Sequence, residues 1–335
     1  MVCLFICYSK YAFTNGEFRV EKHGKSNTLG RFVPETILIS TWDAFSEDGG
    51  WLAKFGIRDR NLALSEALRD AEEWIDANNG SLFILKPSIA RKGSEVIPVR
   101  TLNEVKEIVR TWQDCREWVL QKYVPRLLLL NGNRKFHLRV FIVCVGALKV
   151  HLFKDYIGFF ATSPFQNDDQ WSHITNAFHQ RDHEEFSEEL AFKLPEELAE
   201  LSSKVLNISK EQAMFDFTNP QGRVLQNLSM IISESFRALK ANPAVFQPHP
   251  NCFELFGLDF LLDENLDCHL LEFNSGPDLD QAKENKLSKM IEELVKGLCM
   301  LGLDQNEYDN ERFVCCYSEQ WAFAQNGTQT LFGSH

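Results

Sequence analysis

The sequence has fewer basic than acidic residues, no paired cysteine motif and no long apolar run. Its 335 residues include 35 Lys and Arg against 47 Asp and Glu, a formal net charge of −12. A protein that binds nucleic acid through a basic surface has the opposite balance, so the composition argues against a direct nucleic-acid partner. The nine cysteines have no CxxC spacing and are odd in number. They therefore favour neither a zinc site nor a disulfide framework, and they fit a reducing cytoplasm.

A membrane or export signal is also lacking. The apolar run nearest the N-terminus, Val2–Cys7, is too short to span a bilayer, and no basic stretch precedes it as in a signal peptide. We therefore expect a cytoplasmic protein with no membrane partner. Hydrophobic residues make up 44% of the chain and aromatic residues 12%, as in a globular protein with a sizeable core.

The glycine-rich nucleotide-binding motifs GxxxxGK[ST] and GxGxxG do not occur. What is present is a basic loop with one glycine. A strand at Ser81–Leu85 delivers Lys86 to its end, and the loop Pro87–Ser94, which contains Lys92, leads to a second strand at Glu95–Val99. Backbone N–H groups and lysine charge in such a loop are suited to cover a polyphosphate. The alternative is an ordinary turn, because most turns of this composition bind nothing.

A later strand has a cationic face. Lys135, His137 and Arg139 alternate with apolar residues, so the three basic side chains point to one side. Such a row repels itself unless an anion or a carboxylate lies opposite, and a polyphosphate would serve. The alternative is a solvated basic strand.

The acidic chemistry of the sequence is concentrated in one predicted β-hairpin. Its strands are the apolar runs Leu255–Leu262 and His269–Asn274, joined by a polar turn. With a period of two, Glu272 and Asn274 share a face, and the expected pairing puts Asp259 beside Glu272. Buried carboxylates need a cation, and two carboxylates with an amide oxygen form a hard, incomplete ligand set that suits Mg²⁺. The alternative is a solvated face with lysine partners.

Periodicity and turn residues predict the remaining elements. One segment, Glu184–Glu200, carries seven glutamates and is expected to be an exposed helical insertion interrupted by Pro195. The last thirty or so residues have no clear periodicity. Helices are predicted at Arg60–Ala77, Thr101–Asp114, Asn227–Lys240 and Lys283–Leu303, and further strands at Thr36–Ser40, Glu117–Val124 and Leu148–Phe153.

Five segments in this order, KPSIARKGSEVIPV, LQKYVPRLLLL, RKFHLRVFIVC, HITN and FELFGLDFLLDENLDCHLLEFNSGPD, resemble the tubulin-tyrosine-ligase-like family of ATP-grasp ligases. The chain looks closest to members with a Lys-Phe-His-x-Arg motif. The resemblance implies an α+β, ATP-grasp fold, in which two α+β subdomains grip ATP between antiparallel sheets, with a small N-terminal domain. The domains it implies are an N-terminal domain at 1–80, a central subdomain with phosphate loop and hinge at 81–125, a catalytic subdomain at 126–303 and a tail at 304–335.

The resemblance also implies an activity and a set of site residues. The activity is ATP-dependent ligation of an amino-acid donor to the free carboxylate of a protein or peptide acceptor, through an acyl phosphate. The implied ATP contacts are Lys86, Lys92, Gln121, Lys122, Val124, Lys135, His137, Thr175 and Asn176. The implied reaction centre is Arg139, Lys135 and Asn176, and the implied ligands of one or two Mg²⁺ ions are Asp259, Glu272 and Asn274.

The sequence departs from the family pattern at three points. His137 stands where the family usually has an aspartate that meets the ribose, and the loop Arg91–Val96 has one glycine where two are common. The stretch Ile157–Phe160 lacks the arginine that enzymes acting on tubulin tails usually carry. With the net charge of −12, this last departure predicts that tubulin tyrosination is not the activity. The alternative function is an ATP-binding interaction module of the same fold that catalyses no ligation.

Overall fold

The structure, a computed structural model, divides the chain into two compact units. The first comprises Met1–Lys135 and Phe160–Ala191, and the second comprises Phe136–Phe159 and Phe192–His335. Each unit is therefore assembled from segments that are not contiguous in the sequence. The structure describes residues 28–41, 60–87, 96–113, 115, 117–166, 169–176, 180–181, 183–240, 246–279, 286–303 and 311–319.

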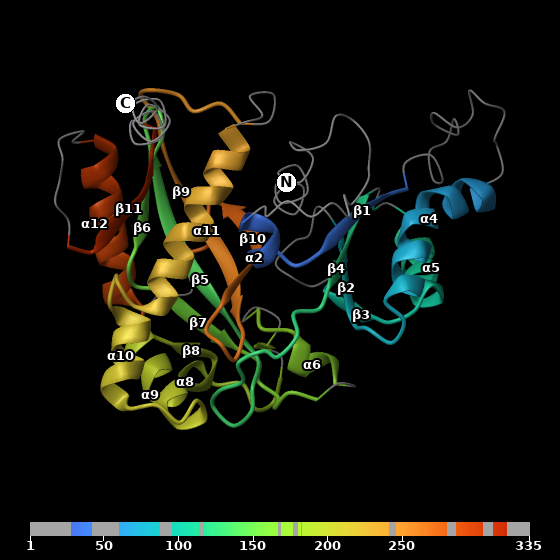
Figure 1. Ribbon diagram of the computed structural model, residues 1–335, viewed down its shortest axis with the longest axis horizontal. Helices are drawn as coiled ribbons and strands as arrows, with labels where there is room; N and C mark the ends of the chain where they lie inside the picture. The colour runs from blue at the N-terminus through green and yellow to red at the C-terminus, as the bar shows by residue number, and fades with distance from the viewer. Residues whose placement is uncertain are drawn as a thin grey trace, which may run out of the picture. The chain divides into compact units, whose positions relative to one another are not determined.

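The first unit is built on a four-stranded antiparallel sheet with the order β1-β4-β2-β3 (Figure 1). Its strands are β1 Thr36–Ser40, β2 Phe83–Pro87, β3 Ile97–Val99 and β4 Glu117–Lys122. Its helices are α2 Thr28–Phe32, α4 Arg60–Ala77, α5 Leu102–Thr111, α6 Gln170–His173 and α8 Glu188–Ala191.

Helices α4 and α5 cover one face of this sheet. Helix α5 begins with a capping box, in which Thr101 and Glu104 satisfy each other's backbone N–H groups, and its buried stripe is Val105 and Val109. These side chains join Phe83 and Leu85 of β2 in one apolar core. Because side chains alternate along a strand, the even-numbered residues of β2, including Lys86, point to the other face.

The second unit contains a seven-stranded sheet with the main order β10-β9-β5-β6-β11, and β7 and β8 extend from β5. Its strands are β5 Phe136–Val145, β6 Lys149–Phe153, β7 Ile157–Phe160, β8 Phe192–Lys193, β9 Phe253–Leu262, β10 Cys268–Ser275 and β11 Phe313–Ser318. Its helices are α9 Pro195–Val205, α10 Lys210–Thr218, α11 Arg223–Lys240 and α12 Ser288–Leu303.

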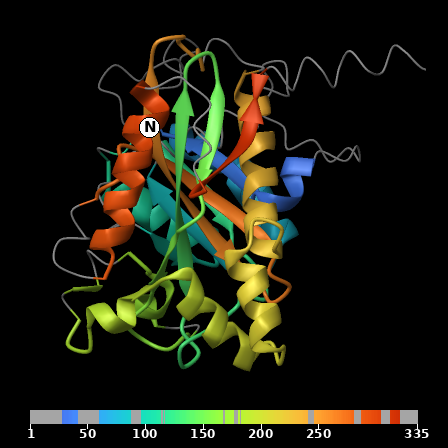
Figure 2. The same ribbon diagram turned by 90° about the vertical axis from the view of Figure 1, so that its left-hand side faces the viewer.

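The two long helices α11 and α12 lie on opposite sides of this sheet (Figure 2). On the α11 side, the ring of Phe236 meets that of Phe273 of β10, with centroids 6.0 Å apart. On the α12 side, the ring of Phe253 of β9 lies against Gly302. Phe253 has the same parity as Asp259, so one face of β9 carries the α12 contact at one end and the predicted acidic site at the other.

Several sequence predictions are corrected by the structure. The segment Glu184–Glu200 is not a single exposed helix interrupted by proline, because Pro195 is the first residue of α9, where its missing N–H is harmless. Phe192 and Leu198 in this segment are buried. In α12 the buried side is formed by Met290, Leu294, Gly297 and Leu301, and Val295, beside that stripe, is 39% exposed.

The C-terminal region contains a strand that the sequence did not indicate. Strand β11 pairs antiparallel with β6 and closes one edge of the large sheet. Near the other terminus, β1 pairs with β4, so part of the predicted N-terminal domain shares a sheet with the predicted central subdomain. The predicted domain limits remain predictions. None of the helices in the described part of the chain has both the length and the apolar character needed to cross a bilayer.

Candidate active site

Two lysines of the first unit are buried together. Lys86 of β2 is 8% exposed and Lys135 is 6% exposed. The Lys86 ammonium donates to Oε1 of Gln121 at 3.4 Å, whereas the Lys135 ammonium donates to the carbonyl of His173 at 3.0 Å and lies 4.8 Å from the centroid of the Tyr123 ring. Burial, and then the charge of Lys86, lower the pKa of Lys135 to about 7. An anion bound beside the two lysines would raise the pKa of Lys135 again, because it would offset both the burial and the repulsion from Lys86.

Tyr123 and His173 form a contact that the sequence did not predict. The Tyr123 hydroxyl lies 2.9 Å from Nδ1 of His173, and their rings meet edge to face at 5.5 Å. Burial raises the pKa of the Tyr123 phenol, so it stays protonated. Tyr123 therefore connects the end of β4 to the His-Ile-Thr-Asn segment.

Gln180 holds the same segment from the other side. Its side chain is fully buried, accepts from the Thr162 N–H at 2.7 Å and donates to the Ile174 carbonyl at 2.9 Å. Thr175 and Asn176, two of the implied ATP contacts, follow Ile174 directly and are half-buried. Nothing in the sequence marked Gln180, because it is one polar residue in a polar loop.

Three of the implied ATP contacts, Gln121, Lys122 and Val124, divide into two kinds. Gln121 and Val124 are buried, and Gln121 donates to the Thr36 hydroxyl at 3.0 Å. The Lys122 side chain points elsewhere, because its ammonium donates to Oδ1 of Asn78 at 2.9 Å. The structure thus connects the Lys122 side chain to Asn78, directly after α4. Lys92 lies outside the described residues.

In the second unit, Arg139 and Asp259 are paired across β5 and β9. The two residues are direct partners in the strand register. The guanidinium donates through Nε to Oδ1 and through Nη2 to Oδ2, the latter at 3.0 Å, which makes a bidentate ion pair. Burial would raise the pKa of Asp259, but Arg139 and then His137 outweigh it and hold that pKa below its usual value.

A β-bulge in β10 brings two more polar side chains to this ion pair. Leu270 pairs with Phe260 and Glu272 with Asp259, so one extra residue, Leu271, is accommodated between them. A ladder without the shift would place Leu271 opposite Asp259 and turn Glu272 to the α11 side. The expected pairing of Glu272 with Asp259 is confirmed.

Asn274 completes this acidic group. Its amide Nδ2 lies 3.4 Å from both Oδ2 of Asp259 and Oε1 of Glu272. A bound cation would favour the opposite orientation of this amide, with Oδ1 toward the two carboxylates. Burial would lower the pKa of Arg139, but Asp259, Glu272 and Asp278 together raise it.

The acidic group fits a divalent cation. Three carboxylates, those of Asp259, Glu272 and Asp278, act on the Arg139 guanidinium, and that of Asp259 is buried. Within the described residues no three His, Cys, Asp or Glu side chains converge as a ligand set. The candidate set instead has two carboxylates and an amide, which suits a hard ion such as Mg²⁺ that keeps several waters. Asp278 was not among the predicted ligands, although the Pro-Asp that contains it was visible in the sequence.

His137 packs against an aromatic wall. Its ring is stacked on that of Phe159 of β7, with centroids 5.0 Å apart and planes 6° apart, and its Nε2 lies 3.8 Å from Oδ1 of Asp259. Phe159 in turn meets Phe192 edge to face at 5.4 Å. Lys135 and His137 are buried and Arg139 is bound to a carboxylate, so the alternative of a solvated basic strand is wrong.

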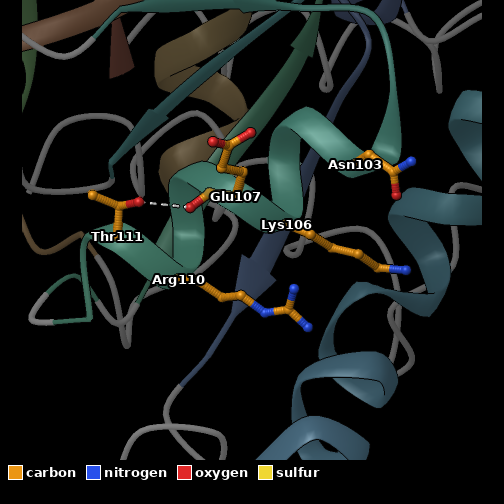
Figure 3. Close-up of a pocket in the computed structure, with 5 residues that line it drawn as sticks. All are labelled: Asn103, Lys106, Glu107, Arg110 and Thr111. Atoms are coloured by element: carbon orange, nitrogen blue, oxygen red, sulfur yellow. Dashed lines mark hydrogen bonds between the residues drawn. The ribbon is translucent and has the colours of Figure 1, made fainter.

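A separate hollow lies on the exposed side of α5 (Figure 3). The side chains of Lys106 and Arg110 extend across it, and the Thr111 hydroxyl donates to the carbonyl of Glu107 at 2.9 Å. With Asn103 these residues form an open surface of mixed charge. None of the predicted site residues that the structure describes lines it, and we assign it no role.

Comparison with known proteins identifies relatives of this chain. The sequence model described as "Tubulin-tyrosine ligase family" matches residues 23–305. A probable tubulin–tyrosine ligase of Saccharomyces cerevisiae is 28% identical, with 82% of this chain and 40% of the relative covered. A probable tubulin–tyrosine ligase of Schizosaccharomyces pombe is 29% identical, with 64% and 56% covered. A probable tubulin polyglutamylase of Caenorhabditis elegans is 26% identical, with 72% and 57% covered. The chain thus spans about half the length of these relatives.

Proposed function

Because this chain belongs to the tubulin-tyrosine ligase family, we propose that it carries the catalytic part of an ATP-dependent ligase that joins an amino acid to a carboxylate of a protein or peptide. The family is of the ATP-grasp class, and the two α+β units with antiparallel sheets have the expected composition. The α+β, ATP-grasp class predicted from the sequence is thus confirmed.

The pair of buried lysines carries the proposal. Burial removes hydration from the Lys135 ammonium and the charge of Lys86 repels it, so the charged form of Lys135 is disfavoured. The phosphate oxygens of ATP supply the negative charge that this arrangement favours. Lys86 and Lys135 are therefore proposed to hold ATP phosphates, with Thr175 and Asn176 beside the terminal one.

The acidic group of the second unit is proposed to hold magnesium through Asp259, Glu272 and Asn274. A magnesium ion supplies neutralisation of phosphate charge and orientation of phosphate oxygens. The bidentate pair with Arg139 keeps the Asp259 carboxylate ionised and fixed, so its oxygens need no rearrangement of the strand to bind a cation.

The proposed reaction has two steps. An oxygen of the acceptor carboxylate attacks the γ-phosphorus, the bond to the bridging oxygen breaks, and ADP leaves. The amine of the amino acid then attacks the acyl carbon of the acyl phosphate, phosphate leaves, and the nitrogen loses a proton to solvent. Such transfers require positioning and charge stabilisation more than a nucleophilic side chain, and Lys86, Lys135 and Arg139 supply that charge.

The test is an incubation of the purified protein with Mg·ATP, a mixture of amino acids and candidate acceptor peptides, read by mass spectrometry. The proposal expects ADP together with a peptide heavier by one amino-acid residue. Replacing Lys86 or Lys135 with alanine is expected to weaken ATP binding by about 1–3 kcal/mol in calorimetry, the scale of a lost charge-assisted contact. Lys204→Ala, which removes an exposed lysine of α9, is the matched control. Unchanged affinity in both site variants would refute the phosphate assignment.

One observation favours a second function, an ATP-binding module without ligase activity. The stretch Ile157–Phe160 forms the buried strand β7, and Phe159 packs on His137 where an arginine for a substrate carboxylate would be expected from the resemblance. The two functions differ in one result. A module binds Mg·ATP with the same dependence on Lys86 but releases no ADP with any acceptor.

A further inference from the structure

Gly257 lies next to the acidic group of the second unit, which consists of Asp259, Glu272 and Asn274. It is buried in β9, where it pairs with Phe141 of β5 on one side and Asn274 of β10 on the other. It is two residues from Asp259 and therefore points to the same face. A residue at this position borders the ion pair of Arg139 and Asp259.

The space beside Gly257 is occupied by two other residues. A Cβ atom added there would lie 2.9 Å from Cβ of Pro277, 3.0 Å from Cδ of Arg139 and 3.5 Å from Nε of Arg139. Carbon atoms in contact are normally about 3.5–4.0 Å apart, so even a methyl group is too large. The Arg139 stem therefore passes directly over the glycine, and Pro277 also borders this space.

We infer that Gly257 is a positioning residue for Arg139: its missing side chain leaves the path along which the Arg139 stem reaches Asp259. The consequence for catalysis rests on the proposed function. The geometric claim does not, because it concerns only where the Arg139 side chain can lie.

The intrinsic preference of strand interiors favours alanine over glycine at this position. Glycine weakens a strand interior through its backbone entropy and lack of a packing side chain, so alanine would be the better residue if only the strand mattered. A loss of stability in Gly257→Ala is therefore a measure of the steric conflict. The question is whether that conflict is with Arg139 or with Pro277 alone.

A double-mutant cycle on thermal stability separates these two cases. We expect Gly257→Ala to lower the melting temperature in the native background and to lower it clearly less in an Arg139→Ala background, because the contact with the Arg139 stem is then gone. Equal losses in the two backgrounds would overturn the inference and leave a packing contact with Pro277. If Gly257→Ala does not fold, the cycle is run in Pro277→Gly, which removes the other contact. In that background, an equal loss of melting temperature from Gly257→Ala with Arg139 and with Arg139→Ala would also overturn the inference. So would a failure of Gly257→Ala to fold in both cases.

The catalytic consequence is measured separately, as ATP turnover per folded molecule. We expect Gly257→Ala to lower kcat by roughly a hundredfold with little change in KM for ATP, since a misplacement of about 1 Å has effects of this size. It should add nothing to the loss in Arg139→Ala. An additive loss, or an unchanged kcat, would contradict the positioning role.

Gly297→Ala is the matched control. A Cβ atom there would lie 2.1 Å from the Phe313 ring, so it also crowds a buried place, but on α12. It should lower the melting temperature without changing kcat per folded molecule. Should the native protein show no ATP turnover at all, the proposed function fails while the stability cycle still decides the inference.

Discussion

At the scale of single residues, Lys135 links the fold to pH. Its pKa in the folded protein is about 7, whereas an ordinary lysine has 10.5. Between these values the unfolded chain binds more protons than the folded one, so stability rises with pH. Below pH 7 both states are protonated and the full penalty of the buried charge is present. Stability of the unliganded protein attributable to Lys135 therefore increases as pH rises from about 7 to about 10.5.

Binding of ATP should raise the lowered pKa of Lys135, so that Lys135 takes up a proton when ATP binds. Phosphate oxygens favour the ammonium form, so at pH 8 Lys135 is expected to gain about one proton when ATP binds. Calorimetry in two buffers of different ionisation enthalpy measures that uptake. Lys135→Arg keeps its charge at all working pH values and should bind ATP without proton uptake. Uptake of the same size in Lys135→Arg, or none in the native protein, would assign the proton to another group.

Glu272 provides a second test at this scale. Glu272→Gln keeps the shape and one oxygen but removes the negative charge, so a metal-binding role predicts loss of ATP turnover with little change in melting temperature. If Glu272 only balanced Arg139, the same change would leave buried charge less compensated and destabilise the fold. A variant that melts much earlier yet turns over ATP normally per folded molecule would show a structural ion pair. Glu292→Gln, on the exposed side of α12, is the control.

At the scale of elements, the acidic hairpin shows what a pattern can and cannot predict. Alternating apolar residues and a polar turn were enough to predict both strands and the pairing of Glu272 with Asp259. The bulge at Leu271 was not predictable, because a single extra residue leaves the local composition unchanged. Without it, the observed turn would put Glu272 on the α11 side. The pairing of Glu272 with Asp259 was therefore predicted correctly, although the bulge at Leu271 that produces it was not.

Gln180, which holds the backbone at Thr162 and Ile174, gives a prediction about the segment that leads to Thr175 and Asn176. Gln180→Ala removes the hydrogen bonds to Thr162 and Ile174 and leaves two buried backbone groups without that partner. We expect a loss of about 1–3 kcal/mol in the free energy of unfolding, the range for such groups, together with weaker ATP binding. Chemical denaturation and calorimetry measure the two effects.

The matched control is Gln226→Ala, an exposed position on α11. It should change neither quantity. Gln180→Ala with normal ATP affinity would show that the segment holds its conformation without this side chain. It would also limit the role of Gln180 to stability.

At the scale of the whole molecule, the sequence predicted the class of fold better than its partition. The bounds predicted for α4, Arg60–Ala77, are those observed, because its apolar spacing is a local signal. The predicted bounds of α5, α11 and α12 differ from the observed ones by one to five residues at one or both ends. The two units are formed from non-contiguous segments, and β11 joins the large sheet from far along the chain. Such pairings depend on contacts between distant residues, and the local composition of Phe313–Ser318 did not reveal them.

The last prediction concerns the acceptor as a whole. We expect no addition of tyrosine to detyrosinated tubulin, for two reasons that can be separated. The chain has a net charge of −12, which disfavours an acidic acceptor, and β7 offers no arginine for its carboxylate. Charge repulsion is screened by salt, whereas a missing arginine is not replaced by it.

Incorporation of radiolabelled tyrosine is therefore measured at low and at high ionic strength, with an active tubulin–tyrosine ligase as the positive control. Absence at both ionic strengths agrees with the missing arginine. Incorporation that appears only at high salt would show that the net charge alone excludes tubulin, and that another residue of this chain binds the acceptor carboxylate. Incorporation at low salt with a turnover typical of enzymes, about 1 per second or faster, would contradict both reasons and make tubulin the acceptor.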